Sequence, residues 1–187
     1  MKKKRCGWVK LNEPVYVTYH DDEWGKPLHD ERALFELFSL ETQSAGLSWL
    51  TVLKKREAYR EVFDNFNLKK VAAYTEKDVR RIMQNGKVIK HKAKIEAIIT
   101  NAKAFKELQN DFTSIDNYFW SKVKHHPIVN DIKEYKNVLT SSDISDATTK
   151  ELKMRGFKFI GSITIYAFMQ ACGMINDHEN DCFCKEK

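Results

Sequence analysis

Residues 37–53 read LFSLETQSAGLSWLTVL and place one carboxylate, that of Glu41, in a pattern typical of an apolar helix face. Leu34, Leu37 and Phe38 precede Glu41 by seven, four and three residues, so on a helix the four side chains share one face. A carboxylate buried there costs free energy unless it has hydrogen-bond partners or a positive charge to face. Two interpretations follow: Glu41 bonds a nearby helix end or an arginine for structural reasons, or it faces a ligand in a binding site.

Local signals predict where the helices around Glu41 begin and end. Asp30 can cap a helix that runs over residues 31–41 or a little beyond. Gly46 interrupts the apolar pattern, and Ser48 can cap a second helix over residues 49–63. Glu41 is therefore expected just before a turn between two helices.

The remainder of the chain is also predicted to be helical. Only seven glycines and three prolines separate long apolar-periodic segments, which indicates an all-α fold. The length predicts one domain over 1–187, with two helical lobes around a cleft as a variant. Further helices are predicted over about 75–84, 92–105, 114–123, 145–155 and 162–172, the last apolar nearly all round and hence central and buried. Residues 6–30 are expected to form an aromatic-rich loop with at most one short helix, and residues 127–142 a long polar loop.

The positive charge is concentrated in the middle of the chain. Residues 54–106 hold fifteen Lys or Arg against six Asp or Glu, so the net charge of this segment is +9. The formal net charge of the whole chain is +6, so the remaining residues together carry −3. An anionic partner such as nucleic acid is one interpretation, and an ordinary solvated helical surface is the other. The basic start of the chain runs directly into CGWVK, and no long apolar stretch follows, so neither a signal peptide nor a membrane span is expected. The four cysteines are then more typical of thiols or metal ligands than of a disulfide framework, and a cytoplasmic protein is expected.

A helical hairpin with a basic turn is expected over residues 75–105. The turn contains Gly86, and the second helix begins beside four lysines: Lys87, Lys90, Lys92 and Lys94. A helix N-terminus has free N–H groups and a positive dipole end, which together with lysines suit a phosphate. Lys90 and Lys92 are therefore candidate DNA contacts, although many helical proteins contain a hairpin that binds no ligand.

The two ends of the chain carry potential zinc ligands. His178 and Cys182 are four positions apart, so on a helical turn both side chains can reach one ion. A four-coordinate site needs two more ligands, and the other end of the chain offers Cys6 and His20. Cys184 could replace Cys182, His29 could replace His20, or all could be ordinary residues, because long-range pairing cannot be derived from spacing.

Five aromatic residues lie near Glu41 in the sequence: Trp8, Tyr16, Tyr19, Trp24 and Trp49. Such residues commonly belong to the core. Beside an inward-facing carboxylate, however, electron-rich rings would also suit a pocket for a flat cationic ligand.

The sequence resembles the DNA-3-methyladenine glycosylase I family along most of its length. The matching motifs are RCGW (5–8), YHD (19–21), EWG (23–25), LE (40–41) with Gln43, AGLSW (45–49), TVLKKRE (51–57), RGFKF (155–159), FMQACG (168–173) and NDH (176–178). The resemblance implies a helix-hairpin-helix superfamily fold and a structural zinc ion bound by Cys6, His20, His178 and Cys182. It also implies that the protein excises N3-methyladenine from alkylated double-stranded DNA by hydrolysing the N-glycosidic bond.

The same resemblance implies roles for individual residues. Glu41 would contact the base at the reaction centre, Trp49 and Tyr19 would stack or bond around it, and Tyr16 and Trp8 would complete the pocket. Leu47 would lie near the gap that the base leaves in the DNA.

Methylation at N3 gives the base a positive charge and weakens its glycosidic bond, so Glu41 is expected to recognise the cation rather than transfer a proton. No lysine is singled out for Schiff-base chemistry, so a monofunctional enzyme without a strand-cleaving lyase step is expected. A monomer is also expected. A zinc-clasped helical DNA-binding protein without catalytic activity is the alternative.

Overall fold

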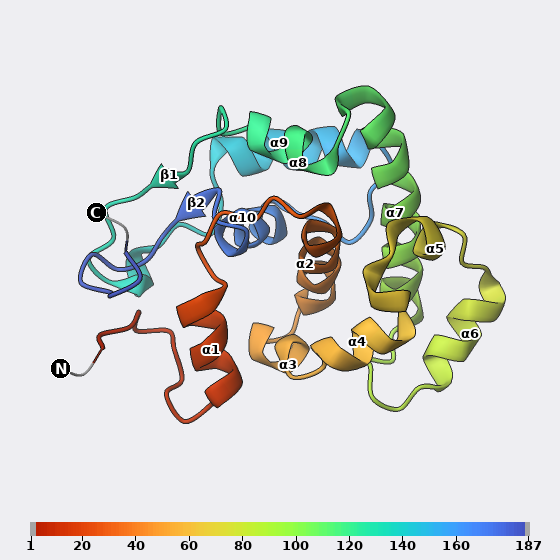
Figure 1. Ribbon diagram of the computed structural model, residues 1–187, viewed down its shortest axis with the longest axis horizontal. Helices are drawn as coiled ribbons and strands as arrows, with labels where there is room; N and C mark the ends of the chain where they lie inside the picture. Colours follow the sequence, from red (N-terminus) through yellow and green to blue (C-terminus); the bar gives the residue numbers. More distant parts are fainter. Residues whose placement is uncertain (1–2, 186–187) are drawn as a thin grey trace.

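The computed structural model describes residues 3–185. Of the domain predicted over 1–187, residues 1–2 and 186–187 therefore lie outside the described residues. The described chain is mostly helical, as predicted (Figure 1). The α-helices are α1 (Pro14–Asp22), α2 (Glu31–Ser44), α3 (Trp49–Leu53), α4 (Arg56–Val62), α5 (Leu68–Ala72), α6 (Glu76–Gln84), α7 (Lys92–Phe112), α8 (Ile115–Ser121), α9 (Asp143–Met154) and α10 (Ser162–Ala171). Two 3-10 turns, Asp64–Phe66 and Tyr135–Asn137, and two short strands, β1 (Ile128–Val129) and β2 (Ile175–Asn176), complete it. None of the helices in this range is long and apolar enough to cross a membrane.

Helix α2 lies at the centre of the molecule, between α10 on one side and α7 on the other (Figure 1). Its apolar face packs into the main core, where Phe38 makes edge contacts with Phe105 of α7 and Phe168 of α10. A smaller core cluster combines both ends of the chain, including Cys6, Trp24 and Cys182. The helix that carries Glu41 therefore reaches from the main core to the region where the termini meet.

The predicted ends of α2 are close to those observed. The side chain of Asp30 accepts a hydrogen bond from the backbone N–H of Ala33 at 2.8 Å, and the helix extends to Ser44, about one turn beyond Glu41. Ser48 caps α3 through its hydroxyl oxygen and the N–H of Thr51. Both caps depend on side chains only three residues away, which explains why local sequence predicts them.

The prediction of one continuous helix over residues 49–63 is wrong. The chain breaks at Lys54 and Lys55, because the N–H of Lys55 bonds the carbonyl of Val52 and tightens the last turn of α3. The two lysines then reach in different directions, Lys54 to the carboxylate of Glu13 and Lys55 to the carbonyl of Lys87. Contacts with these distant partners stabilise the change of chain direction, and the local sequence does not predict these contacts.

Helix α10 is central but not buried all round, which corrects the prediction from its composition. Phe168 and Met169 lie fully in the core, whereas the side chain of Ile163 is 66% exposed. On the exposed side, α10 faces a cavity instead of another helix. The apolar character of this helix therefore reflects both packing and a pocket wall.

The two strands escaped prediction because each pairs with a segment far away in the sequence. Strands β1 and β2 pair in parallel, with Ile128 opposite Ile175 and Val129 opposite Asn176. Strand β1 thus fixes part of the predicted polar loop to the tail that follows α10. Helix α5 lies in a segment for which no helix was predicted.

A glycine turn after α10 brings the C-terminal segment against the N-terminal one. Gly173 has φ +76°, and a Cβ atom there would lie 2.3 Å from the carbonyl carbon of Lys26. The N–H of Leu28 bonds the carbonyl of Cys172 at 3.0 Å, and the N–H of Gly25 bonds the carbonyl of Gln170. Only glycine combines this backbone conformation with so close an approach.

Candidate active site

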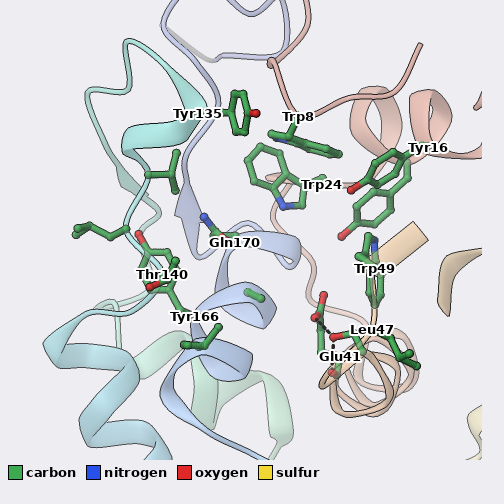
Figure 2. Close-up of a pocket in the computed structure, with 16 residues that line it drawn as sticks. Trp8, Tyr16, Trp24, Glu41, Leu47, Trp49, Tyr135, Thr140, Tyr166 and Gln170 are labelled. Atoms are coloured by element: carbon green, nitrogen blue, oxygen red, sulfur yellow. Dashed lines mark hydrogen bonds between the residues drawn. The ribbon is translucent and has the colours of Figure 1, made fainter. Parts of the chain in front are cut away.

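A cavity of about 430 Å³ opens between the N-terminal segment, the α2–α3 turn and α10 (Figure 2). The aromatic wall comes from the start of the chain and α3, and the opposite wall from residues 135–140 and α10. The lining residues include all the aromatic and acidic residues predicted for the base pocket, namely Trp8, Tyr16, Tyr19, Glu41 and Trp49, together with Trp24 and Leu47. The structure therefore brings the predicted pocket residues together, whereas their roles stay predictions.

Glu41 is buried, with 5% of its surface exposed, and has no basic partner among the described residues. Its carboxylate has one hydrogen-bond partner in that range, the hydroxyl of Ser44 at 3.5 Å. Burial raises the pKa of Glu41 to about 8, and the hydroxyl of Ser44 opposes that rise. Neither structural explanation, an arginine or a helix end, accounts for this carboxylate, which is instead directed into the cavity (Figure 2).

The aromatic side chains form a connected wall above Glu41 (Figure 2). The ring centroids of Tyr19 and Trp49 are 5.4 Å apart, and those of Trp8 and Tyr16 are 5.0 Å apart. Burial, together with the nearby charge of Glu41, raises the pKa of Tyr16 and Tyr19, so both hydroxyls stay protonated. The indole N–H of Trp49 is buried without a hydrogen-bond partner in the described chain. The wall therefore offers aromatic faces and hydrogen-bond donors around one carboxylate.

Sequence reasoning assigned no role to the opposite wall, where Tyr166 and Gln170 of α10 are held by Asp177. The carboxylate of Asp177 accepts from the hydroxyl of Tyr166 at 2.9 Å and from the amide nitrogen of Gln170 at 2.7 Å. Asn130 donates to its other oxygen at 2.7 Å. The NDH motif, which contains Asp177, was the one sequence feature that could have pointed to this wall. The partners of Asp177, however, depend on how the C-terminal tail packs against α10.

The turn between α2 and α3 carries Leu47 at the rim of the cavity, with 45% of its surface exposed. Lys94 anchors this turn from the start of α7, since its ammonium group donates to the carbonyls of Gln43 at 2.8 Å and Ala45 at 2.7 Å. The side-chain amide of Gln43 returns a bond to the carbonyl of Lys94. The cavity rim and the basic hairpin are therefore linked directly.

The basic turn between α6 and α7 differs from the prediction at Lys94. That side chain is 6% exposed and occupied by the two carbonyls, so it does not add charge around the helix end. Lys92 is exposed and pairs with Glu76 and Glu96, whereas Lys90 is exposed without an ion pair in the described chain. The side chain of His91 accepts from the N–H of Lys94 and caps α7.

The four predicted metal ligands lie together and are buried. Their ligand atoms, from Cys6, His20, His178 and Cys182, are all within 4.8 Å of one another. The sulfur of Cys6 is 3.4 Å from Nδ1 of His178, and the sulfur of Cys182 is 3.4 Å from Nε2 of His20. Bond lengths of about 2.3 Å to sulfur and about 2.0 Å to nitrogen imply separations of about 3.5 Å in a tetrahedron, so the donor set fits zinc.

The surroundings of the two histidines fit metal ligation as well. Nδ1 of His20 lies 2.9 Å from the carboxylate of Asp21, and Nε2 of His178 lies 3.1 Å from the carbonyl of Trp24. Each imidazole thus has a partner on the nitrogen that points away from the cluster, as in most metal sites. Asp21 is held in turn by two bonds from Arg5, which lower the pKa of Asp21 to about 2.

The alternative ligands have other surroundings. His29 bonds the carboxylate of Asp116 at 2.8 Å and stacks on Trp120. The sulfur of Cys184 faces the backbone carbonyls of His20 and Asp21 at 3.9 Å. The geometry therefore favours Cys182 over Cys184 and His20 over His29.

Comparison with known proteins identifies the family. A family model described as methyladenine glycosylase matches residues 8–185. The chain is 51% identical to the DNA-3-methyladenine glycosylase of Haemophilus influenzae, with 97% of each chain covered, and 49% identical to DNA-3-methyladenine glycosylase 1 of Escherichia coli, with 97% of this chain and 96% of that one covered.

Solved structures show the same similarity. A crystal structure of a 3-methyladenine DNA glycosylase I superposes with a TM-score of 0.94 at 48% identity, covering 98% of this chain and 100% of that one. The Staphylococcus aureus enzyme, described in a study of 3-methyladenine recognition, superposes with a TM-score of 0.94 at 39% identity, covering 98% and 97%. The chain therefore belongs to the methyladenine glycosylase family.

Proposed function

We propose that this protein is a monofunctional DNA glycosylase that removes N3-methyladenine from alkylated double-stranded DNA. The observation that carries the proposal is the buried carboxylate of Glu41, which has no basic partner in the described chain and faces an aromatic cavity. Relatives that cover nearly the whole chain are named for this activity, and one related protein has been solved in complex with 3-methyladenine.

The cavity selects by charge. At pH 7 the free pocket holds Glu41 mainly protonated, because burial raises its pKa to about 8. A cationic base supplies the positive charge that the buried carboxylate lacks and is also attracted to the faces of Trp49 and Tyr19. Neutral adenine supplies no such charge, so with adenine in the cavity Glu41 stays protonated and no attraction between opposite charges forms.

DNA must deliver the base to the cavity by flipping the nucleotide out of the stack, at a cost of a few kcal/mol that damage reduces. We assign Leu47, exposed at the cavity rim, to the space that the base leaves. Helices α6 and α7 with their connecting turn correspond to the helix-hairpin-helix element, and Lys90 and Lys92 to its phosphate contacts. Lys94 is assigned to the turn that carries Leu47, because both its acceptors lie there.

The chemical step is hydrolysis of the bond between the base nitrogen and C1′ of the sugar. As that bond breaks, its electron pair moves to the base and neutralises the cation, and the oxygen of a water molecule bonds C1′ and releases a proton to solvent. The departing base needs no proton, so Glu41 acts by binding and orienting the cation. No lysine lines the described cavity, which supports a reaction without a Schiff base.

Cys6, His20, His178 and Cys182 would hold a structural zinc ion, for which their donor atoms and hydrogen-bond partners are suited. A bound zinc ion would cross-link the two ends of the chain and would take no part in the chemical step. The ligands lie behind the aromatic wall, where His20 contacts the ring of Trp8. We place the whole chain in one domain that acts as a cytoplasmic monomer, in line with the sequence prediction.

Chromatography of the bases released from methylated DNA tests the proposed activity. The parent protein is expected to release 3-methyladenine, and Glu41→Gln is expected to release it at least tenfold more slowly, since the amide carries no charge for the cation. The zinc content and the unfolding transition of both proteins serve as controls for folding. If a folded parent releases no base, and Glu41→Gln binds DNA as tightly as the parent, the protein is instead a DNA-binding module without catalytic activity.

A further inference from the structure

Glu179 is a second buried carboxylate, and its two oxygens bind two segments that are far apart in the sequence. One oxygen accepts from the backbone N–H of Gly7 at 2.8 Å, and the other accepts from the backbone N–H of Tyr135 at 2.7 Å. The residue is 7% exposed and makes no ion pair among the described residues. The hydrogen bonds to its carboxylate therefore come from backbone N–H groups.

Both segments that Glu179 binds belong to the walls of the base cavity. Gly7 directly precedes Trp8 of the aromatic wall, and Tyr135 begins the segment 135–140 of the opposite wall. Tyr135 and Trp8 both line the cavity (Figure 2). The ring of Tyr135 also rests on Gly7, where a Cβ atom would lie 2.7 Å from Cδ1 of Tyr135. Glu179 is therefore a bridge at the position where the two walls meet.

The backbone that carries Glu179 is itself fixed. Its N–H donates to the sulfur of Cys6 at 3.3 Å. The next residue, Asn180, makes two hydrogen bonds with Ile132. Its N–H donates to the carbonyl of Ile132 at 2.8 Å, and its side-chain oxygen accepts from the N–H of Ile132 at 3.1 Å. A carboxylate on so firmly held a segment can set the distance between the two backbones that it binds.

We propose that Glu179 is a positioning residue that sets the spacing between the Trp8 wall and the 135–140 wall, and thereby the fit of the flipped base. The inference rests on the proposed function, since it concerns the same cavity. A buried carboxylate that accepts charge-assisted hydrogen bonds holds backbone N–H groups more strongly than a neutral acceptor does. Without them the segment 135–140 loses its side-chain anchor at Tyr135, and the cavity widens.

Glu179→Gln tests this role with little change in volume. An amide has one oxygen, and its NH₂ group would face a backbone N–H, so one of the two bonds is lost. We expect the dissociation constant for free 3-methyladenine, followed by tryptophan fluorescence, to rise about tenfold. With methylated DNA, KM is expected to rise and kcat to stay unchanged, because the walls bind ground state and transition state alike.

Asp181→Asn is the matched control, because it removes a carboxylate two residues away whose side chain is exposed and pairs with Lys4. It is expected to leave base affinity at the parent value. A second pair of variants examines the bridge from the other side: Tyr135→Ala removes the ring and keeps the N–H, whereas Tyr135→Pro removes both. Extended Glu134 tolerates a following proline, and Tyr135 occupies the first position of a 3-10 turn. Tyr135→Pro should therefore bind 3-methyladenine more weakly than Tyr135→Ala.

Amide hydrogen exchange reports the bridge without any ligand. In Glu179→Gln the exchange of Gly7 or Tyr135 should accelerate at least tenfold, and in Asp181→Asn neither should change. A parent protein that binds no 3-methyladenine overturns the proposed function. A parent that binds it, with Glu179→Gln binding equally well or Tyr135→Pro equalling Tyr135→Ala, overturns the positioning role alone.

Discussion

At the scale of single residues, Glu41 shows how the surroundings of a buried carboxylate can suit a cationic ligand. Its carboxylate lies among aromatic rings, and its hydrogen-bond partner in the described chain is the hydroxyl of Ser44, at the long distance of 3.5 Å. By contrast, the buried carboxylate of Glu36 is satisfied by Arg32 and Arg60. Two arginines thus neutralise Glu36, whereas Glu41 faces a cavity without a basic partner in the described chain. This arrangement is the one expected of a binding site for a cation.

The raised pKa of Glu41 predicts a pH dependence of stability. The folded-state pKa of about 8 lies above the ordinary value of 4.5, so the folded protein holds the proton more tightly than the unfolded chain. The resulting stability is fully present below pH 4.5 and is lost as the pH rises through 8, with a slope of about 1.4 kcal/mol per pH unit between these values. Glu41→Gln should remove this contribution. Urea unfolding of both proteins from pH 5 to 8 measures it, and parallel curves would contradict the assigned pKa.

At the scale of elements, the start of α7 holds the turn that carries Leu47. Lys94→Met should destabilise the protein by about 2 kcal/mol, because the carbonyls of Gln43 and Ala45 lose a charged donor. Lys92→Met is the matched control, since Lys92 is exposed and its ion pairs are solvated, so its stability should stay within about 0.5 kcal/mol of the parent. Denaturant unfolding distinguishes the two, and equal effects would refute the anchoring role of Lys94.

The turn after α10 predicts a larger effect. Gly173→Ala should cost about 3 kcal/mol or more, since the added methyl group meets the backbone of Lys26 and φ is positive. Gly86→Ala provides the comparison, because no atom lies within 4 Å of a Cβ there and its φ is ordinary. Its stability is expected to change by less than about 1 kcal/mol. Thermal unfolding that shows similar losses for both variants would exclude close approach as the reason for glycine at 173.

At the scale of the whole molecule, the two ends of the chain close the structure behind the aromatic wall. The cluster of Cys6, His20, His178 and Cys182, the proposed zinc ligands, joins residues up to 172 positions apart in the sequence. His20 and His178 both contact the ring of Trp24, so the cluster and the cavity share a wall. Assembly of the termini is therefore part of assembling the site.

Metal analysis tests this closure. The purified protein should contain about one zinc ion per chain, and Cys6→Ala or His178→Ala should lose it together with about 3 kcal/mol or more of stability, because metal binding contributes to folding. Cys184→Ala should retain the zinc, since its sulfur faces backbone carbonyls. Elemental analysis that finds no zinc in the parent, or equal stability of all three variants, would refute a structural zinc site.

The sequence by itself determined the helical class, several helix ends and the family. Caps such as Asp30 and Ser48 act within three residues, and apolar periodicity repeats within two turns, so both are present in local sequence. The family motifs also pointed to the residues that line the cavity and to the proposed zinc ligands, but not to their arrangement in space.

Only the tertiary structure decided what surrounds those residues. The bonds of Asp177 to Asn130 and of Glu179 to Tyr135 in the second wall, of Lys55 to Lys87 after α3, and of Lys94 to Gln43 all join residues at least 32 positions apart. The isolation of Glu41 likewise depends on which segments pack around it. Such contacts form only when the whole chain packs, because their free energy depends on the burial and spacing of segments that local sequence does not bring together.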